Sequence, residues 1–111
     1  MSYDKQPDQI FAQKHNFKYH NIDDILKKSD IIVLSMSLNK DSENLINLEN
    51  LKFIKKDATI INISRGGLIN EADMYSFLKV NPEVHYLTDV LSEEPIKLDH
   101  DFLLFLMLYE A

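Results

Sequence analysis

Residues 58–67, which read A-T-I-I-N-I-S-R-G-G, decide how the rest of the chain is interpreted. Their continuous apolar and β-branched run predicts a strand buried on both faces, with Arg65 directly after it. The only two glycines of the chain, Gly66 and Gly67, follow. Ligands of open α/β sheets bind beyond the carboxyl ends of the strands, so a guanidinium at this place suits a small carboxylate. The alternative is that Arg65 is a surface cation near a helix, and this stretch taken alone favours that simpler interpretation.

Two further apolar runs predict strands on either side of this stretch. Residues 31–36 read I-I-V-L-S-M, and residues 84–90 read V-H-Y-L-T-D-V, which brings Asp89 near the end of the last strand. Apolar residues at helical spacing predict a helix over residues 45–56, and a further helix begins at the cap Asn70. Strands that alternate with helices through short connections predict right-handed crossovers and a parallel sheet.

Shorter elements are predicted near the start of the chain. Pro7 suits the first position of a weak helix, and residues 17–20 predict a very short strand. Asn21 caps a further helix that we expect to end near Ser29.

Composition limits the class of protein. A chain of 111 residues, 45% hydrophobic and 27% charged, is large enough for one core. Its net charge of −6 gives no basic surface, so nucleic acid is not an expected partner. The absence of cysteine excludes disulfides and thiolate metal sites, and no metal is expected. The apolar residues 102–109 are too few to span a membrane, and the first residues lack an apolar signal core, so we expect a cytoplasmic protein.

Three segments together resemble a known family. They are D-S-E-N-L-I-N-L-E-N-L at residues 41–51, A-T-I-I-N-I-S-R-G-G-L-I-N-E-A-D at residues 58–73 and T-D-V-L-S-E-E-P at residues 88–95. In this order they resemble the NAD-binding domain of the D-isomer-specific 2-hydroxyacid dehydrogenases. The resemblance implies an α/β fold, a partial Rossmann-like parallel sheet with flanking helices. It also implies one incomplete NAD-binding domain over residues 1–111, of which residues 96–111 form a divergent apolar tail.

The resemblance implies roles around the reacting end of the cofactor. Arg65 matches the arginine that holds the substrate carboxylate and the carbonyl oxygen, a role that needs a planar and permanently charged fork. Glu94 matches the carboxylate that pairs with a catalytic histidine. Asp89 matches the residue near the nicotinamide carboxamide, and the backbone of Ile63 and Ser64 matches the segment beside that ring.

Four further residues match the adenosine side of the cofactor. Asp4 matches the acid that accepts hydrogen bonds from the ribose hydroxyls, and its charge would repel a 2′-phosphate, which favours NAD over NADP. A turn aspartate is an equally weighted interpretation of Asp4. Met36, Ser37 and Ser42 match positions that line the adenine and the ribose. Family members usually carry proline in place of Ser37, so an ordinary exit from a strand into a loop explains these residues at least as well.

The chain also departs from the family in two places. Its two glycines cannot form the G-x-G-x-x-G turn that binds pyrophosphate, a turn that the family carries upstream of Asp4. The acid-base histidine that follows Glu94 and Pro95 in the family has no match, because His100 is the only histidine after Glu94 and is expected at the surface. The substrate domain is missing as well, so we expect the isolated chain to be inactive.

Two functions follow from these observations. The first is the NAD-binding part of a D-2-hydroxyacid dehydrogenase, an oxidoreductase that acts on the CH-OH group of a small 2-hydroxy or 2-oxo acid. Its missing parts would come either from a complementing chain or from an intact gene of which this sequence is a piece. The alternative is a non-catalytic relic or interaction module, which can form a homo-oligomer and which the apolar residues 102–108 favour. Another α/β enzyme that uses Arg65 is disfavoured, because no nucleophile or metal cluster accompanies this residue.

Overall fold

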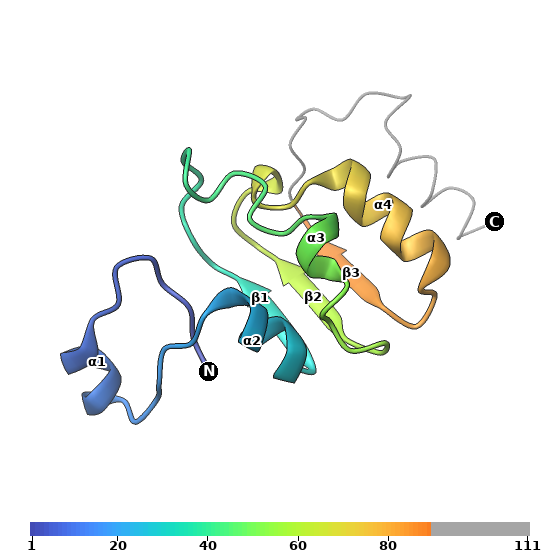
Figure 1. The fold of residues 1–111 in the computed structure, drawn as a ribbon. Helices are drawn as coiled ribbons and strands as arrows, with labels where there is room; N and C mark the ends of the chain where they lie inside the picture. Colours follow the sequence, from blue (N-terminus) through green and yellow to red (C-terminus); the bar gives the residue numbers. More distant parts are fainter. Residues whose placement is uncertain (90–111) are drawn as a thin grey trace.

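The computed structural model describes residues 1–89, and at its centre is a parallel sheet of three strands (Figure 1). The strands are β1 (Ile31–Leu34), β2 (Thr59–Asn62) and β3 (His85–Thr88), in the spatial order β1-β2-β3. The predicted α/β fold with a parallel sheet is therefore confirmed, although each strand is shorter than its apolar run.

Four α-helices and one short 3-10 helix connect or precede these strands. They are α1 (Gln9–Lys14), α2 (Ile22–Lys28), α3 (Leu48–Leu51), the 3-10 helix η1 (Gly66–Leu68) and α4 (Glu71–Val80). The predicted caps Asn21 and Asn70 each accept a backbone N–H of the first turn. Asp8 caps α1, so Pro7 lies outside the helix that it was expected to begin.

The hydrophobic core lies on one face of the sheet. Side chains from α2, α3 and α4 pack there against alternate residues of β1 and β2. The central members of this core are Leu26, Ile32, Leu34, Ile46, Leu51, Ile60, Leu68, Met74 and Leu78. The helices α3 and α4, which connect β1, β2 and β3, contribute to this one core and therefore lie on the same side of the sheet (Figure 1).

The opposite face of the sheet is open among residues 1–89. Its apolar side chains Ile31, Val33 and Leu87 are 63%, 54% and 54% exposed, and Ile63, just after β2, is 60% exposed. The prediction of a strand buried on both faces is met only in part: in β2, Ile60 and Asn62 are buried, Thr59 and Ile61 are half-buried, and Ile63 just beyond is exposed. No described element packs on this face, because every connecting helix lies on the other side.

Backbone pairing replaces two of the predicted elements. The N–H of Ile46 donates to the carbonyl of Leu68 at 3.1 Å, and the N–H of Asn70 donates to the carbonyl of Ile46 at 2.8 Å. Ile46 thus forms a parallel bridge with Ile69, and the expected long helix is reduced to α3. The expected strand at residues 17–20 is a single parallel bridge between Tyr19 and Ser2. Over residues 1–89, no helix has the length and apolarity that a membrane span requires.

Candidate functional site

The carboxyl ends of the three strands lie at one edge of the sheet. Leu34, Asn62 and Thr88, the last residues of β1, β2 and β3, are partners in the strand register. The segments that follow them carry most of the predicted site residues. Ligands of open parallel sheets bind outside this edge, so these segments form the candidate site.

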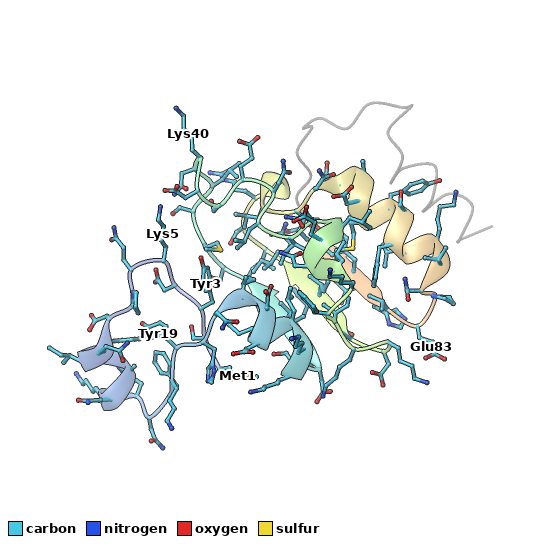
Figure 2. All side chains as sticks on the ribbon, in the orientation of Figure 1. Met1, Tyr3, Lys5, Tyr19, Lys40 and Glu83 are labelled. Carbon is cyan, nitrogen blue, oxygen red and sulfur yellow. The ribbon has the colours of Figure 1, made fainter. Side chains whose placement is uncertain are left out.

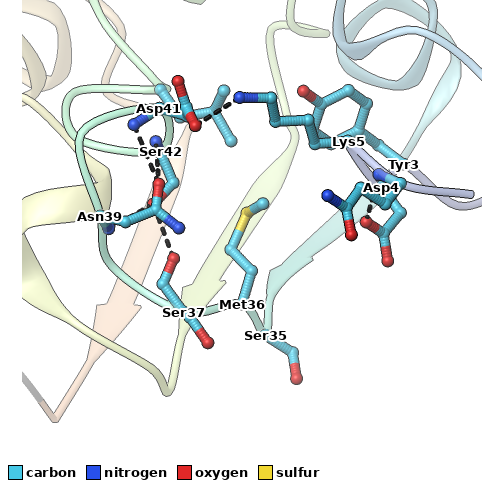
Figure 3. A pocket seen from close by; sticks show the side chains of 11 residues that line it. Tyr3, Asp4, Lys5, Ser35, Met36, Ser37, Asn39, Asp41 and Ser42 are labelled. Carbon is cyan, nitrogen blue, oxygen red and sulfur yellow. Dashed lines mark hydrogen bonds and ion pairs between the residues drawn. The ribbon is translucent and has the colours of Figure 1, made fainter.

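A pocket of about 490 Å³ lies beyond the carboxyl end of β1 (Figure 3). It brings together four of the predicted cofactor residues, Asp4, Met36, Ser37 and Ser42, from two parts of the chain. The remaining lining residues are Tyr3, Lys5, Gln6, Ser35, Asn39, Asp41 and Leu45. Sequence reasoning linked the four residues only through the family, whereas the structure places them around one cavity.

Of the two interpretations of Asp4 that the sequence left open, the turn is confirmed, and the contact with the ribose stays a prediction. Its Oδ1 accepts the backbone N–H of Gln6 at 2.9 Å, which is the turn expected of an aspartate at this place. Asp4 also lines the pocket, and its Oδ2 has no hydrogen-bond donor among residues 1–89. A carboxylate oxygen of this kind can accept a hydrogen bond from a ligand hydroxyl.

An ion pair joins two sides of the pocket. Lys5 Nζ contacts the carboxylate of Asp41, as Figure 3 shows, and both side chains are largely exposed. The pair neutralises Lys5, which leaves the Asp4 carboxylate as the unpaired charge at this rim among the described residues. Exposed pairs contribute little to stability, so this pair affects the charge of the pocket more than the fold.

Ser42 holds the pocket wall in place. Its Oγ donates to the carbonyl of Ser37 at 2.6 Å and accepts the backbone N–H of Asn39 at 2.9 Å. The residue is buried, and its hydroxyl proton is already used. Ser42 therefore shapes the loop after β1, which sequence reasoning did not distinguish from direct contact with a ligand.

Ser64 has a similar structural task between β1 and β2. Its Oγ accepts the N–H of Met36 at 3.0 Å and donates to the carbonyl of Leu34 at 3.1 Å. These bonds continue the pairing of the two strands past their ends. Only backbone groups of Ser64 and of the exposed Ile63 thus remain for a role beside a cofactor ring.

Asn62, which sequence reasoning missed, shapes the turn that carries Arg65. Its side chain is fully buried; Nδ2 donates to the Arg65 carbonyl at 2.9 Å, and Oδ1 accepts the Ser64 N–H at 3.1 Å. Nδ2 also lies 3.3 Å from the hydroxyl oxygen of Tyr86, whose pKa is raised by burial. Its role could have been inferred from the sequence, because Asn62 is an amide side chain between isoleucines in a predicted buried strand.

The other predicted residues are placed as follows. Arg65 is exposed and extended just before η1, and Asp89 is exposed one residue past the end of β3. Glu94 lies outside the described residues, so its position relative to Arg65 stays a prediction. Within residues 1–89, no three His, Asp or Glu side chains are grouped so that they could hold a metal ion.

A parallel sheet flanked by helices, with a pocket beyond the strand ends, places this chain in the Rossmann-like class of α/β folds. A family model described as "D-isomer specific 2-hydroxyacid dehydrogenase, NAD binding domain" matches residues 1–107. The chain therefore belongs to this family of NAD-dependent oxidoreductases.

Similar proteins agree with this assignment. Glycerate dehydrogenase of Cucumis sativus is 41% identical over 75 residues, which cover 68% of this chain and 20% of that protein. Hydroxypyruvate reductase of Blautia hydrogenotrophica is 36% identical and covers 82% of this chain and 28% of that protein. Among solved structures, D-lactate dehydrogenase with NAD+ from Lactobacillus jensenii has a TM-score of 0.75 at 29% identity, covering 90% of this chain and 32% of that one. The chain thus spans less than a third of the length of these relatives.

Proposed function

We propose that this chain binds the adenosine half of NAD and supplies the substrate-binding arginine of a D-2-hydroxyacid dehydrogenase. The observation that carries the proposal is the gathering of Asp4, Met36, Ser37 and Ser42 around one pocket at the edge of the sheet from which Arg65 and Asp89 also follow. When bound, NAD supplies the acceptor for a hydride from the substrate. The residues of this chain then bind and orient the two reactants.

In this proposal each predicted site residue has its own role in binding the cofactor or the substrate. Asp4 accepts hydrogen bonds from the ribose hydroxyls with its Oδ2, while Met36 and Ser37 form the wall against the adenine. The Ile63 and Ser64 backbone and Asp89 lie toward the nicotinamide. Arg65 binds the carboxylate of a small 2-hydroxy or 2-oxo acid through its planar fork, which fixes the plane of the reacting carbon. Glu94 pairs with the catalytic histidine.

The residues of this chain support only the adenosine side of an NAD site. The 111 residues contain two glycines, which are adjacent, so no G-x-G-x-x-G turn exists to bind the pyrophosphate. We therefore propose that turnover requires a glycine-rich turn, a catalytic histidine and a substrate domain, supplied either by a complementing polypeptide or by a longer protein of which these residues are a part. A cytoplasmic location belongs to the same proposal and is testable by cell fractionation.

The isolated chain is expected to bind NADH weakly or not at all. In this fold the pyrophosphate is bound mainly by backbone N–H groups of a glycine-rich turn and by a helix N-terminus, and without them its binding is weak. The measurement is a titration of the 111-residue chain with NADH, followed by the fluorescence of the nicotinamide. Saturation at low-micromolar NADH would contradict the expectation and would mean that the chain holds the pyrophosphate in another way.

Asp4→Asn is expected to change which adenosine nucleotide the pocket prefers. The substitution keeps the oxygen that accepts the Gln6 N–H but removes a negative charge that repels a 2′-phosphate. The affinity for adenosine 2′-monophosphate relative to 5′-monophosphate should rise about tenfold. Amide chemical shifts in a titration of the ¹⁵N-labelled chain measure both affinities. Asp23→Asn, an equal charge change on α2, is the control; an unchanged ratio in the Asp4 variant would remove Asp4 from the site.

The second candidate function, a non-catalytic interaction module, is favoured by one observation. The open face of the sheet exposes Ile31, Val33, Ile63 and Leu87 together, and apolar patches of this kind mark association surfaces. The two functions separate in an assay of the complemented protein, because only the dehydrogenase part oxidises a D-2-hydroxy acid with NAD.

A further inference from the structure

The turn that carries Arg65 is bonded to β3 as well as to β2. In the strand register, Tyr86 and Thr88 of β3 pair with Ile60 and Asn62 of β2. Register partners in a parallel sheet direct their side chains to the same face, so both β3 side chains lie on the face that the helices cover. Ile60 and Asn62 are buried on that face, and Tyr86 packs against the core there. Two polar side chains of β3 thus lie beside the Asn62 amide.

The Asn62 amide has three partners, and two of them set the turn. Its Nδ2 donates to the Arg65 carbonyl at 2.9 Å, and its Oδ1 accepts the Ser64 N–H at 3.1 Å. The third partner is Tyr86, whose hydroxyl oxygen accepts from Nδ2 at 3.3 Å. An amide carries its two N–H donors and its carbonyl in one plane, so these three bonds together select one orientation of the side chain. The Tyr86 hydroxyl therefore helps to fix the amide that holds the Arg65 turn.

A separate bond from β3 holds the backbone of Asn62. The Thr88 Oγ1 donates to the Asn62 carbonyl at 3.1 Å. This bond and the ladder between β2 and β3 keep the end of β2 in place through groups other than the Tyr86 hydroxyl. Removal of that hydroxyl should therefore loosen the Asn62 side chain more than the strand that carries it.

The Tyr86 hydroxyl is neutral at physiological pH. Burial raises its pKa, side-chain hydrogen bonds with Asn62 and Thr88 lower it, and the negative charge of Glu71 raises it, with an upward shift as the result. The phenol therefore keeps its proton. Tyr86→Phe changes no charge near Arg65, so this substitution tests the position of the turn without changing its electrostatics.

We propose that Tyr86 is a positioning residue for Arg65 and thereby sets how tightly the carboxylate of a small 2-hydroxy or 2-oxo acid is bound. Tyr86 acts through the Asn62 amide rather than by contact with substrate or cofactor. This inference rests on the proposed function, because it requires that Arg65 binds the carboxylate. A guanidinium makes two parallel hydrogen bonds only in a fixed orientation, so a small displacement of its turn weakens both bonds.

The alternative is a tyrosine that only fills the core. Its ring packs against the buried cluster, and a phenylalanine ring would pack there equally well. Packing explains the ring but not the place of the hydroxyl. The hydroxyl accepts a hydrogen bond from the side chain that bonds to both Ser64 and Arg65, and this contact favours the positioning role.

The first test follows the turn in the ¹⁵N-labelled 111-residue chain without substrate. Tyr86→Phe should speed hydrogen exchange of the Ser64 amide at least about fivefold, because the side chain that accepts this N–H is less firmly held. The Thr59 amide, which donates to the Asp30 carbonyl at the start of β2, should exchange as in the native chain. Comparison of the two amides separates a looser turn from a general loss of stability.

The second test measures substrate binding in a complemented or full-length form that has dehydrogenase activity. Tyr86→Phe should raise the KM for the D-2-hydroxy acid at least about fivefold and leave the KM for NAD within about twofold. A tyrosine that only packs would lower the amount of active protein and leave both KM values unchanged. Tyr19→Phe is the matched control and should change neither value, since Tyr19 lies beside α1 at the opposite end of the molecule from β3 (Figure 2).

Three outcomes contradict the positioning role. An unchanged KM for the hydroxy acid in Tyr86→Phe overturns it, whatever the exchange rate of Ser64. A raised KM with native exchange at Ser64 also overturns it, because the effect then does not pass through the turn. If Tyr19→Phe raises the same KM as much, the effect is not specific to β3 and the role is wrong as well.

Arg65→Ala separates this inference from the proposed function. If Arg65→Ala loses activity while Tyr86→Phe keeps the native KM, the positioning role is wrong and the proposed function stands. If Arg65→Ala keeps full activity, the proposed function is wrong in its substrate site. The positioning role then fails with it, even where Tyr86→Phe speeds exchange at Ser64.

Discussion

Arg65→Ala is expected to lower NADH formation from a D-2-hydroxy acid at least about a hundredfold, in any complemented or full-length form that has this activity. The guanidinium is exposed at the carboxyl edge of the sheet, on a turn whose backbone Asn62 holds at two points. Alanine removes both the charge and the two parallel hydrogen bonds that orient a carboxylate. The loss should therefore appear in kcat as well as in KM.

Two further variants test whether the effect depends on the planar guanidinium of Arg65. Arg65→Lys keeps the charge but not the planar pair of donors, and its rate should fall between those of the native and alanine forms. Lys56→Ala removes a cation before the start of β2, at the opposite edge of the sheet, and should leave the rate unchanged. Initial rates of NADH absorbance measure all three. Full activity of Arg65→Ala would remove this residue from the substrate site.

The strands and most helix starts could be predicted because their signals are local. Apolar β-branched runs predicted β1, β2 and β3, although their ends lie one or two residues inside the expected limits. Asn21 and Asn70 predicted the first residues of α2 and α4, since a capping side chain bonds within its own first turn. Arg65 and Asp89 were predicted near strand ends for the same reason.

The open sheet face could not be predicted, because the sequence of a strand does not show whether another element packs on it. An apolar run indicates that both faces suit burial, and Ile31 and Val33 do suit it. Whether a helix lies over them depends on segments far away in the sequence. The helix predicted at Ile46 was wrong for a related reason. The spacing of this residue fits a helix, but its backbone N–H and C=O groups bond to the chain at and just after η1. Long-range pairing overrode the local pattern in both cases.

The site was predicted through the family resemblance rather than through spacing. Asp4 and Met36 are far apart in the sequence, and nothing local connects them across the pocket. The resemblance also could not separate residues that contact a ligand from those that build the wall. The structure makes that separation for Ser42 and Ser64, whose hydroxyl groups bond to the chain itself.

Asn62→Ala is expected to lower the free energy of unfolding by about 2–4 kcal/mol. The amide is fully buried and bonds to the Arg65 carbonyl, the Ser64 N–H and the Tyr86 hydroxyl. Alanine leaves partly buried backbone groups without these partners and creates a cavity at the end of β2. The change is thus a large fraction of the total stability of a small domain.

Urea unfolding of the 111-residue chain, followed by circular dichroism, measures this effect. Ser76→Ala on the exposed side of α4 is the control and should change stability by no more than about 0.5 kcal/mol. A similarly small change for Asn62→Ala would mean that its amide bonds do not hold the turn in solution. In that case the position of Arg65 would depend on other contacts, such as the bonds of Ser64 to Met36 and Leu34 and the bond from the Asn44 N–H to the Gly67 carbonyl.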